Sequence, residues 1–321
     1  MTIFTPDYYS QFQCIADSCP DSCCKEWAVD VDKETADYYR NLPGELGDRL
    51  REVLTDDNTM TIIDGRCPMW RQDGLCRIHA ELGHDALCQT CRDFPRIRHE
   101  FDEFTELGLE LSCPEAARLI LTTEWDMPLP YTSNDPNLWL LLQSRAAVLD
   151  LLEYEDFPLP ETLAIILVYA HHVQTCMDTD DVPILQPEAY LETAKQFPKK
   201  GNCKALFAFF AQLEVLTQDW KKRLNENPKP ICWDKTLKAL ARYMILRYWL
   251  QAVSDLDLVG RTKLTIAACL IVGAMGGDPI STSQLFSKEI ENDPDNIEAI
   301  LDGAYTSPAL TDQNLFSLLL P

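Results

Sequence analysis

The sequence predicts a mainly α-helical protein with two parts. Residues 1–126 are expected to form a cysteine-rich N-terminal module with short β-strands, and residues 138–321 an all-helical, bundle-like domain. Nine of the thirteen cysteines lie in the first 113 residues, and the other four are isolated. Beyond residue 137, long segments repeat apolar residues at the i, i+3, i+4 spacing of helices. This contrast between the two ends of the chain predicts the division.

Short elements are expected throughout the N-terminal module. The alternation in WAVDVD predicts a strand at 27–32, after which Asp32 can cap a helix at 33–42. A final helix at 112–123 has Pro114 at its first position, which places Cys113 at the cap. The other elements expected here are a helix at 45–54, strands at 59–64, 66–70, 75–78 and 104–111, and a helical turn or two at 79–87.

A proline- and turn-rich stretch, MPLPYTSNDPN at 127–137, is interpreted as the linker between the two parts. After it, helices are expected at 138–154, 161–177, 203–224, 234–256, 261–275, 282–292 and 296–305. The two glycines at 276–277 follow an apolar segment and indicate a helix C-cap and a turn.

The charge balance limits the partners of the protein. The 321 residues include 28 Lys and Arg against 51 Asp and Glu, which gives a net charge of −23. Such a charge argues against nucleic acid and against an anionic membrane surface as partners. An acidic surface that maintains solubility is the simpler explanation, although a basic substrate such as a lysine side chain would also suit it.

We expect a cytoplasmic protein. The first ten residues, MTIFTPDYYS, lack the basic and apolar regions of a signal peptide. The longest apolar stretches, LAIILVYA and LTIAACLIVGAM, are short for a membrane span. Cytoplasmic thiols are mostly reduced, so the dense cysteine pattern indicates metal binding or chemistry rather than disulfides.

The cysteines of the N-terminal module are the candidate metal ligands. They are Cys14, Cys19, Cys23, Cys24, Cys67, Cys76, Cys88, Cys91 and Cys113. The Cys88-x2-Cys91 pair places two thiolates close enough to bind one ion or cluster. Cys23 and Cys24 are adjacent, so we expect one to ligate and the other to face a neighbouring site or the core.

The residues leave the identity of the bound group open. A zinc ribbon normally has two CxxC pairs, and this chain has one. Iron–sulfur clusters take thiolates from scattered loops, and Cys-Pro pairs such as Cys67-Pro68 and Cys113-Pro114 recur in ferredoxin-type sequences. An iron–sulfur cluster, a zinc ion, and a set of reduced structural or sensor thiols are therefore the three alternatives. The CxxxCxxC triad of radical enzymes is absent.

Four stretches together resemble the flagellin lysine N-methylase family, which belongs to the bacterial cysteine-cluster proteins with a CxxxCC signature. They are YYSQFQCIADSCPDSCCKEWAVDVDKET, RCPMWRQDGLCRIHAELG, LCQTCRDFPR and LELSCPEAARLI. The resemblance covers roughly residues 7–120 and, more loosely, 230–275. One departure is visible: the family usually has glycine before Trp27, where this chain has Glu26.

The resemblance implies an enzyme, an S-adenosylmethionine-dependent protein lysine N-methyltransferase that acts on flagellin or another protein. It also implies a [4Fe-4S] cluster held by the nine N-terminal cysteines, with zinc as the alternative metal. The contrasting hypothesis is a non-catalytic zinc- or iron-chelating protein with a structural or redox-sensing role.

Methyl transfer to lysine requires a neutral amine, and free lysine has a pKa of about 10.4, so the site must remove or exclude a proton. Tyr8, Tyr9, Asp30 and Asp32 lie near the first cysteine group and are candidate proton acceptors, although capping and strand-edge roles are simpler. The catalytic residue itself is not predicted.

Three arginines after the CxxC pair are the predicted cofactor-binding residues: Arg92, Arg96 and Arg98. They could clamp the carboxylate of the methyl donor or donate hydrogen bonds to cluster sulfides, and a solvated basic face is the alternative. The sequence contains no glycine-rich strand–turn–helix of the common methyltransferase fold. A donor site, if present, is therefore expected to have a different architecture.

Overall fold

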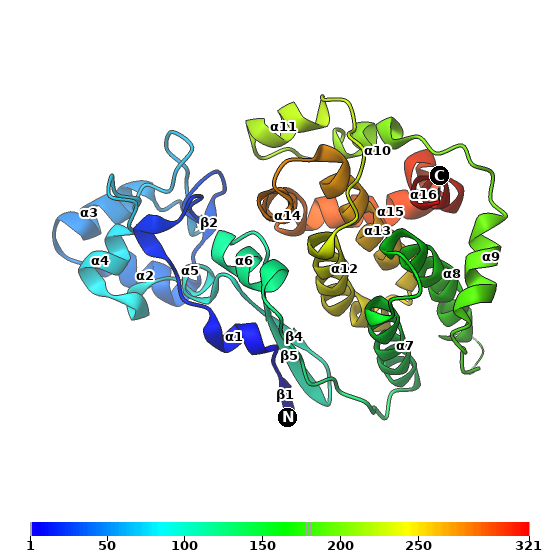
Figure 1. Ribbon diagram of the computed structural model, residues 1–321. Coiled ribbons are helices and arrows are strands. Elements are labelled where there is room, and N and C mark those ends of the chain that lie inside the picture. The colour runs from blue at the N-terminus through cyan, green and yellow to red at the C-terminus, as the bar shows by residue number, and fades with distance from the viewer. Residues whose placement is uncertain (1, 178, 180, 321) are drawn as a thin grey trace.

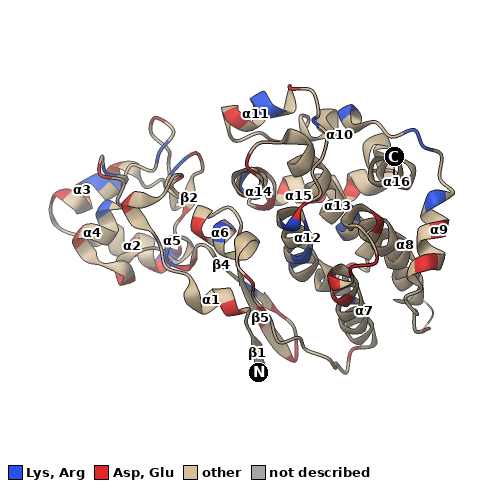
Figure 2. Cartoon of the chain, viewed as in Figure 1, with Lys and Arg blue, Asp and Glu red and all other residues tan. Residues whose placement is uncertain are grey.

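The computed structural model describes residues 2–177, 179 and 181–320, and its predominantly helical chain confirms the predicted fold class. Figure 1 shows a smaller N-terminal part beside a larger body of helices, with α6 and the β4–β5 hairpin between them. Acidic and basic residues are distributed over both parts rather than gathered in one of them (Figure 2).

The N-terminal part consists of short elements. Its helices are α1 Asp7–Gln11, α2 Lys33–Asn41, α3 Gly44–Val53, α4 Arg77–Leu82, α5 Gln89–Asp93 and α6 Pro114–Thr122. Its strands are β1 Thr2–Phe4, β2 Val29–Asp30, β3 Thr59–Met60, β4 Arg96–Glu100 and β5 Phe104–Leu109. The strand β5 pairs in parallel with β1 and antiparallel with β4, and β2 pairs antiparallel with β3.

A small apolar core holds α2, α3 and the loops that carry several cysteines. Leu50 and Tyr39 are fully buried in it, and the thiols of Cys67 and Cys88 belong to it. As predicted, Asp32 caps α2 by accepting the Thr35 backbone N–H at 3.0 Å. The same carboxylate also accepts the Gln89 N–H at 2.9 Å, which fixes the start of α5 and the Cys88–Cys91 turn.

The sheet β1–β5–β4 and α6 pack on the larger core of the helical body. Across this contact, the buried guanidinium of Arg145 forms two bonds to the Glu106 carboxylate of β5, one at 2.9 Å and one at 2.5 Å. Such an ion pair is stable in the interior because both charges are compensated. The first 126 residues thus contribute to both apolar cores, the small one and the larger one. The division of the chain into domains at 127–137 stays a prediction.

The helical body follows from Pro136. Its elements are α7 Pro136–Glu153, α8 Leu159–Met177, α9 Pro187–Lys195, α10 Cys203–Phe210, α11 Gln218–Leu224, α12 Lys235–Tyr248, α13 Leu258–Met275, α14 Pro279–Phe286, α15 Pro294–Thr306 and α16 Asp312–Leu319. The helix α13 packs against α8, α12 and α15. It is long and apolar enough to cross a membrane by length and composition, but 94% of it is buried inside the protein. Its apolar character is therefore accounted for by its central position.

The structure corrects several predicted elements. The single helix expected at 203–224 is broken, because Thr217 ends the loop and caps α11 by accepting the Trp220 N–H. The strands expected at 66–70 and 75–78 do not form. Arg66 forms isolated bridges with Lys25 and Ile63, and Trp70 forms one with Cys76, after which the chain turns into α4 one residue later.

The helix predicted at 282–292 ends in a π-helical turn, η4, Ser287–Glu291. All five of its residues are buried. Single π-turns within α-helices often mark functional sites, because they redirect side chains that a regular helix would place elsewhere. Three charged side chains of this turn line the cavity described next.

Candidate functional site

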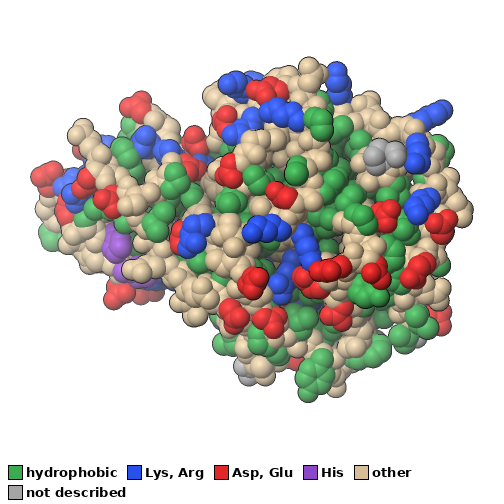
Figure 3. Space-filling model, in the orientation of Figure 1, with side chains coloured by type: hydrophobic (Ala, Val, Ile, Leu, Met, Phe, Trp, Pro, Cys, Tyr) green, Lys and Arg blue, Asp and Glu red, His purple; other side chains and the backbone are tan. Residues whose placement is uncertain are grey.

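A cavity of about 610 Å³ lies where the cysteine-rich segment meets the helical body. One wall comes from the loop after the CxxxCC motif, from β2 and from the α5–β4 segment, and the other comes from η4 and the start of α15. Figure 3 shows a notch in the molecular surface between these two parts of the molecule. The cavity volume is within the range of pockets that bind small ligands.

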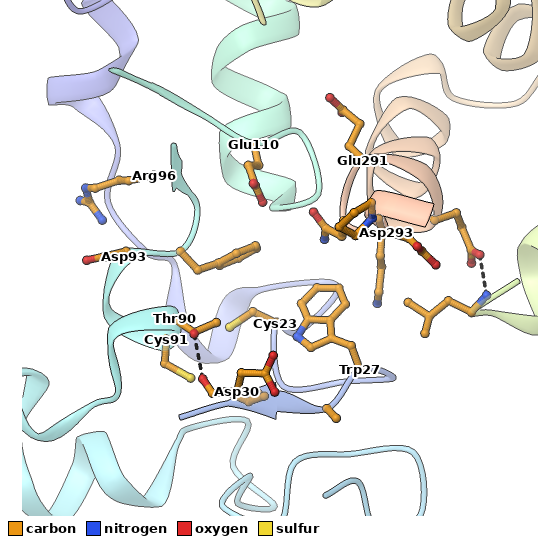
Figure 4. Close-up of a pocket in the computed structure, with 18 of the residues that line it drawn as sticks. Cys23, Trp27, Asp30, Thr90, Cys91, Asp93, Arg96, Glu110, Glu291 and Asp293 are labelled. Atoms are coloured by element: carbon orange, nitrogen blue, oxygen red, sulfur yellow. Dashed lines mark hydrogen bonds between the residues drawn. The ribbon is translucent and has the colours of Figure 1, made fainter. Parts of the chain in front are cut away.

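Thiol and aromatic side chains form the N-terminal wall. Cys23 and Cys91 both line the cavity, one from each of two cysteine groups. The rings of Trp27 and Phe94 also line it, with centroids 6.1 Å apart and planes inclined by 54°. In Figure 4 the Cys23 side chain lies beside the Trp27 ring, and its sulfur points toward the side of Thr90 and Cys91.

The lining is strongly acidic. Among the described residues that line the cavity, seven carry carboxylates and two carry cations. The acids are Asp30, Asp93, Glu110, Glu214, Glu289, Glu291 and Asp293, and the cations are Arg96 and Lys288. A cavity with this balance favours a cationic ligand over an anionic one.

The carboxylates of the helical wall already have partners. Glu289 accepts the backbone N–H groups of Leu216 and Thr217, each at 2.8 Å, and burial raises its pKa. Glu291 is fully buried and accepts bonds from Arg247 at 3.0 Å and from Tyr248 at 3.0 Å. These two carboxylates therefore stabilise the wall rather than face a ligand.

Glu110 is different. It follows β5, and its side chain is 20% exposed. Its partners are the Ser112 hydroxyl at 3.3 Å and a guanidinium nitrogen of Arg247 at 3.5 Å. Burial raises the pKa of Glu110. Figure 4 shows its carboxylate pointing into the cavity, toward Cys23 and Trp27.

Lys288 joins the two walls. Its ammonium lies 2.9 Å from Asp21 and 2.7 Å from Glu26, and 5.2 Å from the Trp27 ring. The side chain of Lys288 is only 1% exposed, so this pairing compensates a buried charge. Glu26 has a φ of 74°, a left-handed conformation that favours glycine. Where the family usually has glycine, this chain thus has a glutamate in a strained conformation, and the carboxylate of that glutamate pairs with Lys288.

The thiols of the first cysteine group contact one another. The proximity of Cys23 and Cys67 lowers the pKa of Cys24, and the pKa of Cys23 and of Cys67 is raised in turn. The Cys67 thiol itself donates to the Met60 sulfur at 3.4 Å. Cys91 likewise lowers the pKa of Cys88. Burial raises the pKa of Cys76, and the charges of Cys24 and Cys88 add to this effect, so these thiols lie in one neighbourhood.

The other cysteines form a second neighbourhood. Burial raises the pKa of Cys113 to about 11, and the charges of Cys19 and Cys14 add to it. Cys14 and Cys113 also act on Cys23, which therefore lies between the two neighbourhoods. As predicted, Cys113 is the N-cap of α6.

The donor set fits a thiolate-bound metal or cluster in chemistry and in number. In residues 2–177, 179 and 181–320, however, no three Cys, His, Asp or Glu side chains are arranged around one point as the ligands of a metal ion. The cysteines are free thiols. The metal-ligand assignment of the nine cysteines consequently stays a prediction.

The predicted arginines separate in the structure. Arg96 lines the cavity, but its guanidinium points away from the centre in Figure 4, and the guanidinium carbon lies 5.2 Å from the Phe12 ring centre. Arg98 is exposed and pairs with Glu100 at 2.6 Å. Neither Arg98 nor Arg92 is among the described residues that line the cavity.

The predicted proton acceptors also differ in their position relative to the cavity. Asp30 lines the cavity and accepts the Thr59 hydroxyl at 3.0 Å, whereas Asp32 is a helix cap. Tyr8 is buried against Trp125, with ring centroids 4.8 Å apart, and burial raises its pKa. Tyr9 is not among the described residues that line the cavity.

Sequence reasoning missed Glu110, Lys288 and the two glutamates of η4. A signal was present, since SKEIEN places three charges within four residues of a predicted helix. Buried charges of this kind require partners from elsewhere in the fold, and they therefore indicate a site.

Fold and site together define a mainly helical protein with a cysteine-rich segment and an acidic, thiol-edged cavity at its junction with the helical body. The chain is 31% identical to the flagellar biosynthetic protein FliU of Salmonella muenchen over 135 residues, 38% of this chain and 78% of the relative. It is 24% identical over 299 residues to the Lysine-N-methylases of Salmonella typhimurium and Salmonella choleraesuis, 84% of this chain and 73% of each relative. The chain belongs to this lysine-N-methylase family, as its motifs predicted.

No protein-family profile matches the chain, and no solved structure matches it. The family assignment therefore rests on the sequence motifs and on these relatives, and not on a comparison of folds.

Proposed function

We propose that the protein is an S-adenosylmethionine-dependent methyltransferase that methylates lysine side chains of a protein, with flagellin as the first candidate substrate. The observation that carries this proposal is the acidic cavity at the junction of the two parts, in a chain whose relatives are named Lysine-N-methylase. The name of a flagellar relative supports the choice of flagellin.

The cavity suits the chemistry of this transfer. The bond from the methyl carbon to the donor sulfur breaks as the carbon bonds to the lysine Nζ, and the amine must first lose its proton. Carboxylates around the cavity attract the ammonium and are available to receive that proton, directly or through water. The aromatic rings of Trp27 and Phe94 limit access of bulk water to the reacting atoms and favour a cationic sulfonium.

Arg96 is the proposed partner of the donor carboxylate. Two cations line the described cavity, Arg96 and Lys288. Lys288 is already neutralised by Asp21 and Glu26, whereas Arg96 has no carboxylate within ion-pair distance among the described residues. Arg92 and Arg98 are proposed to add positive charge beside it without direct contact. Arginine suits this role because its planar guanidinium binds a carboxylate through two parallel hydrogen bonds.

A [4Fe-4S] cluster is proposed as the resident group of the N-terminal part. Cys23, Cys24, Cys67, Cys76, Cys88 and Cys91 form the neighbourhood from which four ligands would come, and Cys14, Cys19 and Cys113 form a second neighbourhood. When bound, such a cluster supplies iron–thiolate bonds that hold distant loops together. Cys23 and Cys91 would then be fixed at the edge of the cavity.

The direct test is co-expression of the protein with flagellin in the cytoplasm of a host that lacks this activity, followed by intact-mass analysis of the flagellin. The proposal expects a ladder of mass increments for one, two and three methyl groups, absent when the methylase is omitted. An unmodified flagellin, with cluster loaded and donor present, would exclude this substrate.

A second candidate is a non-catalytic metal-binding protein with a structural or redox-sensing role. It is favoured by the burial of Cys67 and Cys88 in the small apolar core, where a zinc ion would also stabilise the fold. Anaerobic purification with iron, sulfide and zinc counted per chain separates the two. Zinc without sulfide, together with no binding of S-adenosylhomocysteine in calorimetry, would support the second candidate.

A further inference from the structure

We propose that Glu110 is the residue that binds the ammonium group of the acceptor lysine, with Trp27 and Phe94 holding the alkyl chain and any methyl groups already on the nitrogen. This assignment rests on the proposed methylase function and locates its acceptor site. It follows from the geometry of the cavity in three steps.

The first step is the availability of the carboxylates. Glu289 and Glu291 are engaged by backbone N–H groups and by Arg247 with its neighbouring tyrosine. Asp293 caps α15 by accepting the Asp295 and Asn296 N–H groups at 2.9 and 3.2 Å. Ligand binding through these groups would remove bonds that hold the wall together.

The second step is direction. In Figure 4 the Glu110 carboxylate points into the cavity from above, Asp30 lies on the opposite wall, and Asp93 points away from the centre. The backbone N–H of Glu110 donates to the Pro95 carbonyl at 2.8 Å, which fixes the start of the side chain. Glu110 is thus a positioned carboxylate aimed at the space between the two walls.

The third step is the chemistry that surrounds this space. The ring of Trp27 already accepts one ammonium, that of Lys288, on the side that faces η4. In that contact the ammonium is held by carboxylates and by the indole face together, which is the combination that recognises lysine and its methylated forms. Glu110, Trp27 and Phe94 offer the same combination to a lysine that enters from outside.

This arrangement predicts the class of acceptor: an unbranched aliphatic chain that ends in an ammonium with zero to three methyl groups. Aromatic rings retain a methylated ammonium, because they interact with its diffuse charge without needing an N–H donor. A partly methylated lysine can therefore bind again, and successive transfers to one side chain are expected.

The experiment measures binding separately from catalysis. The probes are N-acetyl-lysine-N-methylamide, its trimethyl-lysine analogue and the norleucine analogue, which lacks the nitrogen. Their dissociation constants for the full-length protein are measured by ligand-observed NMR in the presence of S-adenosylhomocysteine. Both charged probes are expected to bind, and the norleucine analogue about fivefold or more weakly.

Three variants carry the same loss of one negative charge. Glu110→Gln is expected to weaken binding of both charged probes about fivefold, Asp30→Asn less than twofold, and the surface control Glu100→Gln not at all. Glu100 pairs with Arg98 outside the cavity. Should Glu110→Gln fail to fold by circular dichroism, Glu110→Asp, which retracts the carboxylate by one methylene, is expected to weaken binding to a smaller extent. Phe94→Leu is expected to reduce the affinity for the trimethyl probe more than that for lysine.

The outcomes distinguish this assignment from the proposed function. Equal binding of the charged probes to Glu110→Gln and to Glu100→Gln would overturn the role of Glu110, even if flagellin is methylated. Binding that depends on Glu110, without any methylation of flagellin, would support the acceptor site and reject that substrate. Failure of the lysine probe to bind better than the norleucine probe would overturn the acceptor site.

Discussion

The two parts of this molecule reach stability by different routes. In the described chain, the small N-terminal core contains fourteen buried apolar residues, two of which are cysteines, whereas the larger core, which the helical body shares with α6 and the sheet β1–β5–β4, contains sixty-six. A core of the smaller size rarely stabilises a fold unaided, and natural domains of this size add metals or disulfides. The comparison predicts that the cysteines stabilise the fold where apolar burial is scarce and contribute little where it is abundant.

The strands of the first 126 residues sharpen this contrast. The sheet β1–β5–β4 and α6 share the core of the helical body, and the Arg145–Glu106 ion pair fastens β5 to α7. The segment predicted to depend on its cysteines is therefore shorter than the cysteine distribution indicates. It extends roughly from Cys14 to Asp93, with Cys113 contributed from the helical side.

The largest effect is expected from Cys24→Ser, because Cys24 contacts both Cys23 and Cys67 and lies at the centre of the thiol neighbourhood. We expect the variant to lose its bound metal and to become sensitive to limited proteolysis within residues 14–93. Helical circular dichroism should be largely retained, since the helical body has its own core. The matched control is Cys232→Ser, an exposed cysteine of the helical body, which should keep metal content and protease resistance. A protease-resistant Cys24→Ser would contradict the dependence of this segment on sulfur.

Trp220→Ala tests the other side of the comparison. Trp220 is fully buried between the rings of Phe210 and Phe286, with centroids 6.5 and 6.2 Å away. Removing this side chain leaves a cavity, and the free energy of unfolding of the helical body should fall by about 3–5 kcal/mol. Urea denaturation followed by circular dichroism measures the loss. Leu50→Ala, its counterpart in the small core, should not shift the urea midpoint of the helical body. If Leu50→Ala lowers that midpoint as Trp220→Ala does, the two cores unfold as one unit.

A pH effect is expected at His99 of β4. Burial lowers its pKa from 6.5 to about 4, and the charges of Arg247 and Arg145 add to this effect. The unfolded chain therefore binds this proton first, so stability is full above pH 6.5 and falls as the pH decreases towards 4. Because the ring is partly exposed, we expect a loss of about 2 kcal/mol at pH 4.5. Urea midpoints at pH 7 and pH 4.5 measure it, and His99→Gln should reduce the difference between them.

Local patterns allowed much of the fold to be predicted. Helical periodicity located α7, α8, α13 and α15 within a few residues, and the caps Asp32 and Cys113 are as predicted. Gly276, with a φ of 66°, ends α13 as expected of a C-cap glycine. These features depend on neighbours along the chain, which is why sequence patterns reveal them.

The cavity could not be predicted in the same way. Its lining joins Cys23 to Lys288, which are more than two hundred residues apart in the sequence, and no local pattern records that contact. Arginines at 92, 96 and 98 look equivalent in the sequence, but among the described residues only Arg96, at the start of β4, lines the cavity, while Arg98 on the same face of β4 lies farther along the strand and pairs with Glu100. The thiol pool was visible from its spacing, whereas its partition into neighbourhoods depends on the fold.

The smallest expected effect concerns the link between the two parts. Lys288 of η4 binds Asp21, which lies within the CxxxCC motif, and Glu26, which lies two residues after it. Lys288→Met keeps the apolar stem and removes the charge, so both carboxylates lose a partner. Because Asp21 and Glu26 remain 26% and 35% exposed, water compensates part of the loss, and we expect a cost of about 1–2 kcal/mol.

The position of Lys288 makes this cost local. Hydrogen exchange should increase in residues 19–27 and in η4, while α8 and α13, which hold neither of the two carboxylates paired with Lys288, keep their protection. Lys288→Arg retains a cation and should restore most of the protection, which a purely steric role would not predict. Uniform exchange throughout the molecule in Lys288→Met would mean that this residue supports the helical core itself, and the two parts would then not be stabilised independently.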